Sequence, residues 1–354
     1  MTSADDNSKL YSYISASPVG ISAGDLHKHF LEVSRPTINR WLKDALGRGI
    51  IVTEGKGSAT IYKSADQLLS IKRYFEQSQQ ERAVARYQES LLLHSQASHL
   101  LLEVNPHLEI LKSNAAHDKL DKREFVQFLI DFSCASSALE GGTYSQLDTQ
   151  ALIQYGEVAE GKSIEDAFLI LNHKRALEYL YANLSLSSAV EVHRLMTDDH
   201  NLPELQGSIH FLNKEKMGIR EYDEVNIQTT TYHPPFRPGT GYIKKMFNQI
   251  IETAESIADP VDSAFYLFSR IPYLQPFSDG NKRTARALCN VPLLRAGLPP
   301  ISFIDFSKRD YIISMLSFYE LGDTRYAEKT FAKSYLKSIN RLPKPSVHTT
   351  IKPK

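Results

Sequence analysis

Residues 271–286 read Ile-Pro-Tyr-Leu-Gln-Pro-Phe-Ser-Asp-Gly-Asn-Lys-Arg-Thr-Ala-Arg, and this stretch decides the fold prediction. Apolar residues at helical spacing precede it, an Asp-Gly-Asn turn interrupts it, and a second apolar run follows. The pattern predicts a helix, a turn and another helix. Because the first N–H groups of a helix are unpaired and the helix dipole is positive there, the turn predicts an anion-binding site.

The charged residues near this turn suit the phosphates of a nucleotide. Arg283 and Arg286 are three residues apart, so both guanidinium groups should leave the second helix on nearly one face. Asp279 is the only acid of the turn, and it stands where a magnesium ion (Mg²⁺) carried by phosphates can be held. The sequence therefore predicts a phosphate site around residues 279–286.

The stretch resembles the signature of the Fic (Fido) family, His-Pro-Phe-x-x-Gly-Asn-Gly-Arg-x-x-Arg, whose members transfer AMP from ATP to protein hydroxyl groups. The resemblance assigns nucleotide binding to five residues: Gly280, Asn281, Lys282, Arg283 and Arg286. It implies ATP and Mg²⁺ as cofactors, with Asp279 on the metal and Arg286 as the catalytic clamp on the γ-phosphate. Gln275 stands where the family has its catalytic His, and Lys282 replaces a glycine.

Gln275 puts turnover in question. In the family, the motif His takes the proton of the target hydroxyl, since the pKa of an imidazole lies near the working pH. A carboxamide can orient a hydroxyl by hydrogen bonding but does not take its proton near neutrality. Loss of a general base typically costs on the order of a hundred- to ten-thousand-fold in rate. We therefore expect nucleotide binding, with catalysis by Gln275 and Arg286 left open.

The triplet Asn281-Lys282-Arg283 leaves a second chemistry open. It resembles the Doc branch of the family, which phosphorylates its targets. Gly280 and Arg286, however, follow the adenylylating pattern, and Gly280 lets the backbone approach a phosphate closely. AMP transfer is the main expectation and Doc-like phosphotransfer is an alternative. A degenerate core that only senses ATP for a transcriptional regulator is another.

A second motif lies upstream, where an amphipathic helix around residues 125–141 ends in a glycine pair. Its end resembles the Fic inhibitory motif, Ser/Thr-x-x-x-Glu-Gly/Asn, matched by Ser136, Glu140 and Gly141. The resemblance implies autoinhibition in which Glu140 pairs with Arg286, the guanidinium that should hold the γ-phosphate. In the alternative, Glu140 is merely exposed at a helix end.

Residues 225–231, Val-Asn-Ile-Gln-Thr-Thr-Thr, are rich in β-branched side chains and predict a strand. In the Fic family a short hairpin of this kind, the flap, registers the target peptide by strand addition. The resemblance implies that Ile227, Thr229 and Tyr232 have this role, whereas a purely structural hairpin is the alternative. His210 lies at a family arginine position without a catalytic role, and Asn172 and His173 are expected to be structural.

The first 64 residues predict a winged helix-turn-helix, in which Ser22 and Ser34 cap two of three short helices before a hairpin. Ile38, Leu42 and Leu46 should face inward on the third helix, which would enter a major groove of DNA. The residues expected to contact DNA are Arg35, Asn39, Arg40 and Lys43 on this helix and Lys56 in the wing. A domain used only for protein contacts is the alternative.

Residues 65–97 contain no Gly or Pro and predict one long helix, which the Asn105-Pro106 pair should follow as a break. The apolar stripe of this helix could pack inside the chain or form the interface of a homodimer. The predicted domains are a winged helix-turn-helix at 1–64, a helical linker at 65–120, a Fic domain at 121–342 and a disordered tail at 343–354. The predicted fold class is therefore mostly α, an all-helical Fic core with a small β-hairpin flap beside the N-terminal winged helix-turn-helix.

Composition and charge bear on which partners and which cell compartment to expect. The 354 residues hold 41 basic and 41 acidic side chains, so no global field draws the chain to nucleic acid or membranes. The only two cysteines, Cys134 and Cys289, are expected to be buried thiols. No signal peptide or membrane-spanning run is evident, so we expect a cytoplasmic protein. The expected partners are ATP, a protein hydroxyl or the chain's own, and DNA through residues 1–64.

Overall fold

The computed structural model describes residues 3–114, 120–223, 225 and 227–341. The predicted tail at 343–354 lies outside them. The chain divides into two compact units. The first comprises Met1–Arg86, Ile227–Tyr232 and Leu316–Tyr326, and the second comprises Tyr87–Asn226, His233–Met315 and Ala327–Lys354. Each unit has its own apolar core, and each is described separately below.

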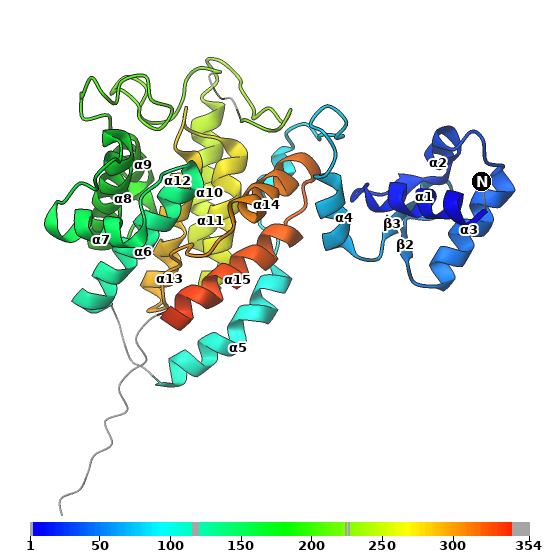
Figure 1. The fold of residues 1–354 in the computed structure, drawn as a ribbon, viewed down its shortest axis with the longest axis horizontal. Helices are drawn as coiled ribbons and strands as arrows, with labels where there is room; N and C mark the ends of the chain where they lie inside the picture. The colour runs from blue at the N-terminus through cyan, green and yellow to red at the C-terminus, as the bar shows by residue number, and fades with distance from the viewer. Residues whose placement is uncertain (1–2, 115–119, 224, 226, 342–354) are drawn as a thin grey trace, which may run out of the picture. The chain divides into compact units, whose positions relative to one another are not determined.

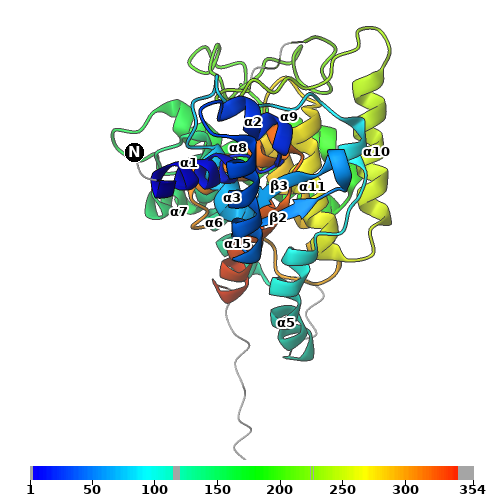
Figure 2. The same cartoon turned by 90° about the vertical axis from the view of Figure 1, so that its right-hand side faces the viewer.

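The first unit begins with the N-terminal region, residues 3–64, which alternates helices and short strands (Figure 1). Its elements, with the helix that follows, are α1 (Ser3–Ser15), β1 (Ile21–Ser22), α2 (Ala23–His29), α3 (Arg35–Gly47), β2 (Ile51–Glu54), β3 (Ile61–Ser64) and α4 (Gln67–Tyr74). The strands form one antiparallel sheet in the order β1-β3-β2, with Ile51 opposite Ser64. Figure 2 shows the hairpin of β2 and β3.

The predicted caps and hairpin of the N-terminal region are confirmed. The Ser22 hydroxyl accepts the N–H of Asp25, and the Ser34 hydroxyl accepts the N–H of Thr37. The inward position of Leu46 is wrong, since 37% of its surface is exposed. The buried face of α3 has the 3.6-residue period of Ile38, Trp41, Leu42 and Ala45, and Leu46 falls at the rim of that stripe.

The second unit is helical (Figure 1). Its elements are α5 (Ser98–Asn114), α6 (Lys122–Glu140), α7 (Gln146–Tyr155), α8 (Ile164–Asn183), α9 (Ala189–Thr197), α10 (Tyr242–Ser256), α11 (Pro260–Leu274), α12 (Asn281–Leu288), α13 (Asn290–Arg295), α14 (Lys308–Leu321) and α15 (Arg325–Arg341). Helices α14 and α15 each cross the boundary between the units. The mostly helical fold class is confirmed.

Helix α11 is the centre of the second unit. Every residue from Val261 to Leu274 is buried, and the helix contacts α5, α10, α12 and α13. Helix α12 contacts α8 and α9 in turn, and α8 contacts α6. The turn between α11 and α12 therefore lies among helices from several parts of the chain, which can bring their side chains to it.

The long helix predicted for residues 65–97 is wrong. Helix α4 ends at Tyr74, and the chain continues through turns and an irregular stretch to a 3₁₀ turn at Glu89–Leu92. Tertiary contacts outweigh helix propensity here. The Tyr87 ring stacks on Tyr273, and the Gln88 N–H donates to the Tyr273 hydroxyl at 2.8 Å.

The break predicted at Asn105-Pro106 is also wrong, because Pro106 lies inside α5. A buried apolar stripe of Leu100, Leu101, Val104 and Leu108 holds α5 across the proline.

A strand is predicted for residues 225–231, but the described residues of this stretch form none. Gln228 and Thr229 form a turn, and Thr229 has a φ of +71°. Side chains decide this conformation: Arg82 donates to the Thr229 carbonyl, and Thr230 and Tyr232 are buried. Outside the N-terminal sheet, the described residues hold only isolated bridges, one of which joins Ile219 and Phe277.

Two smaller expectations concern the thiols and the membrane. Cys289 is buried as predicted, whereas Cys134 is only partly buried, and both are free thiols. Among the described residues, no helix combines the length and apolar character needed to span a bilayer.

Candidate functional site

The site is built on the turn from α11 to α12, which has the predicted helix–turn–helix form. Asp259 caps α11 and Pro260 occupies its first turn. Gln275 ends the helix in the left-handed conformation, with a φ of +51°. Gly280 starts α12 at a φ of +75°, and a Cβ there would lie 2.5 Å from the Thr197 methyl carbon. Glycine is therefore required by both the backbone and the space.

Asn281 fixes the shape of the turn. Its side-chain oxygen accepts the Phe277 N–H at 2.9 Å, and its side-chain nitrogen donates to the Phe277 carbonyl at 2.8 Å. No side chain in the described part of the chain caps α12. An anion at the first N–H groups of this helix stays a prediction from the sequence.

Arg286 is fully buried and bound from three directions. Its Nη2 donates to Glu140 Oε1 at 2.6 Å, and its Nη1 donates to the Tyr311 hydroxyl at 2.6 Å. Its Nε donates to the Ser136 hydroxyl at 2.9 Å, and Nη2 also reaches the Ser136 carbonyl at 3.2 Å. The structure thus brings Ser136 and Glu140 to Arg286, as the motif resemblance implies. The alternative of an exposed Glu140 is wrong, because only 13% of its side chain is exposed.

In the pair of Glu140 and Arg286, the charge of each group stabilises the ionised form of the other. Burial alone would raise the pKa of Glu140, but the charges of Lys282, Arg286 and Arg283 lower it below the usual range of a glutamate. Burial alone would lower the pKa of Arg286, but Tyr311 and Glu140 raise it. Both groups are therefore ionised near neutral pH, and the ion pair is intact.

His173 extends this network into the core. Its Nδ1 lies 2.5 Å from the Leu169 carbonyl and its Nε2 lies 2.7 Å from the Ser136 hydroxyl. Burial lowers the pKa of His173 to about 3, so the ring is neutral. Since a carbonyl only accepts, Nδ1 carries the proton and Nε2 accepts from Ser136. The Ser136 oxygen is then free to accept from Arg286, which orients the guanidinium.

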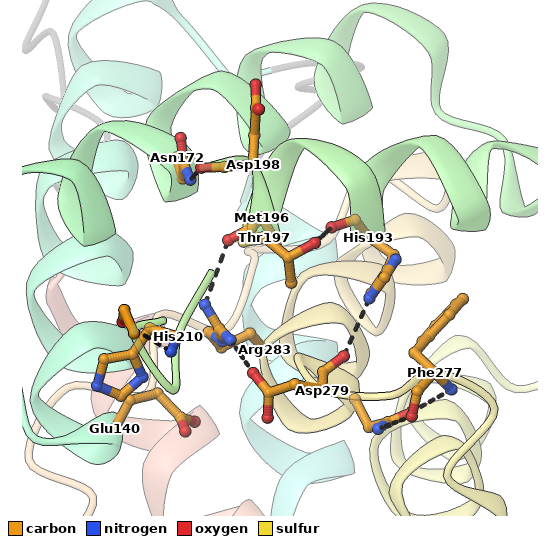
Figure 3. Close-up of polar contacts among 12 residues, drawn as sticks. Glu140, Asn172, His193, Met196, Thr197, Asp198, His210, Phe277, Asp279 and Arg283 are labelled. Carbon is orange, nitrogen blue, oxygen red and sulfur yellow. Dashed lines mark hydrogen bonds and ion pairs between the residues drawn. The ribbon is translucent and has the colours of Figure 1, made fainter. Parts of the chain in front are cut away.

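Arg283 has different hydrogen-bond partners from Arg286, although the charges of both arginines act on Glu140. The Arg283 guanidinium pairs with the Asp279 carboxylate and donates to the Met196 carbonyl at 3.2 Å (Figure 3). The buried start of α12 turns the two arginines toward different neighbours: α9 supplies the Met196 carbonyl, whereas α6 supplies Glu140.

His193 holds the same turn, and the sequence interpretation missed it. Its Nε2 donates to the Asp279 carbonyl at 3.0 Å, and its ring stacks on Phe277 at 3.8 Å (Figure 3). Burial lowers the pKa of His193 to about 3. The only sequence signal was a histidine between two buried apolar residues of α9, Val192 and Met196.

Gln275 uses its carboxamide to hold the turn. Its nitrogen donates to the Pro272 carbonyl at 2.7 Å, and its oxygen accepts from Asn281 at 2.6 Å. Arg220, which the sequence interpretation also missed, donates from Nε to the Gln275 carbonyl at 2.7 Å. With 6% of its surface exposed, Gln275 is positioned as a structural residue at the place of the family base.

Asp279 is the only predicted metal ligand. Its side chain is 46% exposed and pairs with Arg283. Over the described residues, no three His, Cys, Asp or Glu side chains lie close enough to form a metal site. A single carboxylate fits only a Mg²⁺ ion that also takes oxygen ligands from phosphates and water, which is the arrangement the sequence predicts.

The remaining predicted residues are spread over both units. In the second unit, the Asn172 side chain donates to the Asp198 carbonyl at 2.8 Å. His210 is half-buried, and its backbone N–H donates to the Ser208 hydroxyl. In the first unit, Ile227 is half-buried, Thr229 is exposed and Tyr232 is buried. The residues predicted to contact DNA are all exposed: Arg35, Asn39, Arg40, Lys43 and Lys56.

Comparisons with known proteins agree on one family. Residues 183–293 match the model of the Fic/DOC family. The chain is 30% identical over 211 residues to the protein adenylyltransferase fic-1 of Caenorhabditis briggsae, a match that covers 58% of this chain and 39% of that protein. It is 28% identical over 198 residues to the protein adenylyltransferase Fic of Nematostella vectensis, covering 54% and 43%. The chain thus spans about two fifths of the length of these curated relatives.

Solved structures show the same fold. Fic-1 from Caenorhabditis elegans matches with a TM-score of 0.52 and 24% identity, covering 69% of this chain and 70% of that one. A Fic family protein from Desulfovibrio desulfuricans G20 matches with a TM-score of 0.53 and 17% identity, covering 72% and 77%.

Proposed function

We propose, from the match of residues 183–293 to the Fic/DOC family, that this chain is an autoinhibited, ATP-binding protein of the adenylyltransferase type. Its reaction is the transfer of AMP from ATP to a hydroxyl group of a protein. Two features hold the activity down: Glu140 occupies Arg286, and Gln275 replaces the family's base. The observation that carries the proposal is the buried ion pair between Arg286 and Glu140, at 2.6 Å.

The chain's own groups would bind the triphosphate. The N–H groups at the start of α12 would bind a phosphate, and Arg283 and Arg286 lie on the first two turns of that helix. Asp279 would hold a Mg²⁺ ion carried by the phosphates, which would neutralise part of their charge. Positioning and electrostatic stabilisation supply much of the catalysis in this class of reaction, so these residues form most of the required apparatus.

Glu140 would act against the γ-phosphate in two ways. It already takes the Nη2 donor of Arg286, and its own negative charge would face the phosphate. ATP then binds with its triphosphate in an unreactive pose, or binds no better than ADP. Removal of the carboxylate frees the guanidinium, while Ser136 and Tyr311 still orient it.

The direct test is transfer of label from ATP by the double variant Glu140→Gly/Gln275→His in the presence of Mg²⁺. The proposal predicts incorporation of the α-label into the protein itself or an added protein. Glu160→Gly/Gln275→His is the matched control, since Glu160 is an exposed glutamate outside the site, and it should stay near background. Incorporation of the γ-label alone would replace AMP transfer with Doc-like phosphotransfer. Absence of both labels would contradict the proposal.

We also propose that the N-terminal region binds duplex DNA through α3. Arg35, Asn39, Arg40 and Lys43 are exposed on α3, and Lys56 is exposed between β2 and β3. This placement fits a helix in a major groove and a wing on the phosphate backbone. An intact chain with no affinity for duplex DNA at low salt would leave the protein-contact alternative.

A further inference from the structure

Residues 227–232 belong to the same compact unit as the N-terminal region. The chain on both sides, up to Asn226 and from His233 onward, belongs to the second unit. This segment holds Ile227, Thr229 and Tyr232, for which the family resemblance implies a role in registering a protein target. Its contacts within the first unit therefore bear on how a target would be presented.

A buried arginine and a buried glutamate hold the segment. Arg82 donates to the Thr229 carbonyl and lies 3.4 Å from Glu320, with 7% of its side chain exposed and none of the Glu320 side chain. The Thr230 hydroxyl also hydrogen-bonds to Glu320. The Tyr232 ring packs 5.3 Å from the Tyr319 ring. The buried side chains of Thr230 and Tyr232 and the carbonyl of Thr229 are thus held by Arg82 and by the end of α14.

The same glutamate is bound to the N-terminal side of the unit. The hydroxyl of Tyr74, the last residue of α4, donates to Glu320 at 2.8 Å. Helix α4 contacts α1 and β3, and Arg73 donates to the Ser15 hydroxyl. Just after α4, the Gln77 amide donates to the Ala16 carbonyl at 3.1 Å. Hydrogen bonds therefore run from the N-terminal region through Tyr74 and Glu320 to the segment.

Two local features indicate that the segment depends on these contacts. Burial raises the pKa of Glu320, although Thr230, Tyr74 and Arg82 each act to lower it. A buried charge of this kind is tolerated only while its partners remain in place. Thr229 is a β-branched residue at positive φ, a strained conformation that persists only where neighbouring contacts impose it. Arg82 supplies such a contact at the Thr229 carbonyl.

We propose that Arg82 and Glu320 are positioning residues that fix residues 227–232 to the N-terminal region. The segment's conformation then depends on α4, so a ligand of the N-terminal region that moves α4 changes how the segment is presented. The inference that movement of α4 regulates target modification rests on the proposed function. The attachment of residues 227–232 to the N-terminal region does not depend on that function.

Amide hydrogen exchange of the full chain, read on peptides covering residues 228–232, tests the attachment. Arg82→Ala should speed exchange there by about tenfold, because the segment loses a charge-assisted hydrogen bond. Tyr74→Phe removes only the hydroxyl on Glu320 and should give a smaller increase in the same peptides. Arg82→Lys should restore part of the protection, since an ammonium can still face Glu320. Arg86→Ala, at an exposed arginine of the same stretch, is the matched control and should change nothing.

Two results would overturn the inference. In one, Arg82→Ala leaves exchange in residues 228–232 unchanged. In the other, it raises exchange equally in peptides from α1, α2 and α3, which would make Arg82 a general stabilising residue. Calorimetry with ATP–Mg²⁺ on the same proteins separates this outcome from the proposed function. Loss of ATP binding in the wild type and in Glu140→Gly would contradict the nucleotide role and leave the exchange result standing.

Discussion

The arginines of α12 and those of α3 contrast in what they bind. Arg283 and Arg286 are buried and are partnered by the chain's own carboxylates, Asp279 and Glu140. Arg35 and Arg40 are exposed on α3. A buried, oriented guanidinium is a strong phosphate ligand, but its own glutamate must leave first. An exposed one needs no release and contributes less per contact. The first arrangement suits a switched catalytic site, and the second suits a salt-dependent interface.

The largest expected effect concerns the joint action of Gln275 and Glu140. Neither Gln275→His nor Glu140→Gly alone should give high AMP transfer, since each leaves the other defect in place. The double variant should exceed the product of the two single effects, because a base helps only when the triphosphate lies in the reactive pose. Restoring the base should contribute on the order of a hundred- to ten-thousand-fold in the Glu140→Gly background. Initial rates with α-labelled ATP measure all four proteins, and simple multiplication of effects would contradict the coupling.

Removal of Arg286 should strongly destabilise the second unit. Arg286→Ala leaves the carboxylate of Glu140 buried without its main partner, which typically costs about 3–5 kcal/mol. Urea denaturation measures the loss, and Arg309→Ala, at an exposed arginine of α14, is the control. Glu140→Ala/Arg286→Ala should recover part of the stability, since no unpaired carboxylate remains. Equal stability of the single and double variants would show that the pair is not coupled.

The buried histidines predict how stability depends on pH. Burial lowers the folded-state pKa of His193 to about 3, from the ordinary histidine value of 6.5. Between these values the unfolded chain binds more protons, so stability is present above pH 6.5 and falls as the pH decreases. His193→Gln should reduce the loss between pH 6.5 and pH 5 by about 2 kcal/mol. Identical pH profiles in urea denaturation would show that His193 is not held neutral.

The smallest effect concerns the exposed arginines. If α3 reads a major groove, Arg40→Ala should weaken specific DNA binding by roughly 1–3 kcal/mol, whereas Lys56→Ala should mainly reduce the salt dependence. Fluorescence anisotropy over a salt series, once a preferred duplex is selected, measures both. If both variants change only the salt slope, α3 would contact phosphates without reading bases.

Local patterns were enough to predict the turn between α11 and α12 and the caps of α2 and α3. These features depend on neighbouring residues, such as a glycine at positive φ or a serine before a helix. The contact of Glu140 with Arg286 was predicted from a family motif, because nothing in the local pattern links residues 146 positions apart.

Long-range contacts explain what the sequence did not predict. Residues 65–97 have helix-forming composition, but Tyr87 and Gln88 bind Tyr273 and interrupt the helix. The β-branched stretch at 225–231 turns at Thr229, where Arg82 binds its carbonyl. His193 and Arg220 are part of the site only because the fold brings them to the turn. No spacing rule identifies such residues in a single sequence.

The relation between Glu140 and the γ-phosphate is tested most directly by comparing the affinities of ATP–Mg²⁺ and ADP–Mg²⁺ by calorimetry. In the wild type, Glu140 holds Arg286, so the two nucleotides should bind alike. In Glu140→Gly, the freed guanidinium should favour ATP by about tenfold, the effect of one hydrogen bond to a charged group. Glu160→Gly should behave as the wild type. An ATP preference that is the same in the wild type and in Glu140→Gly would contradict the proposed inhibition.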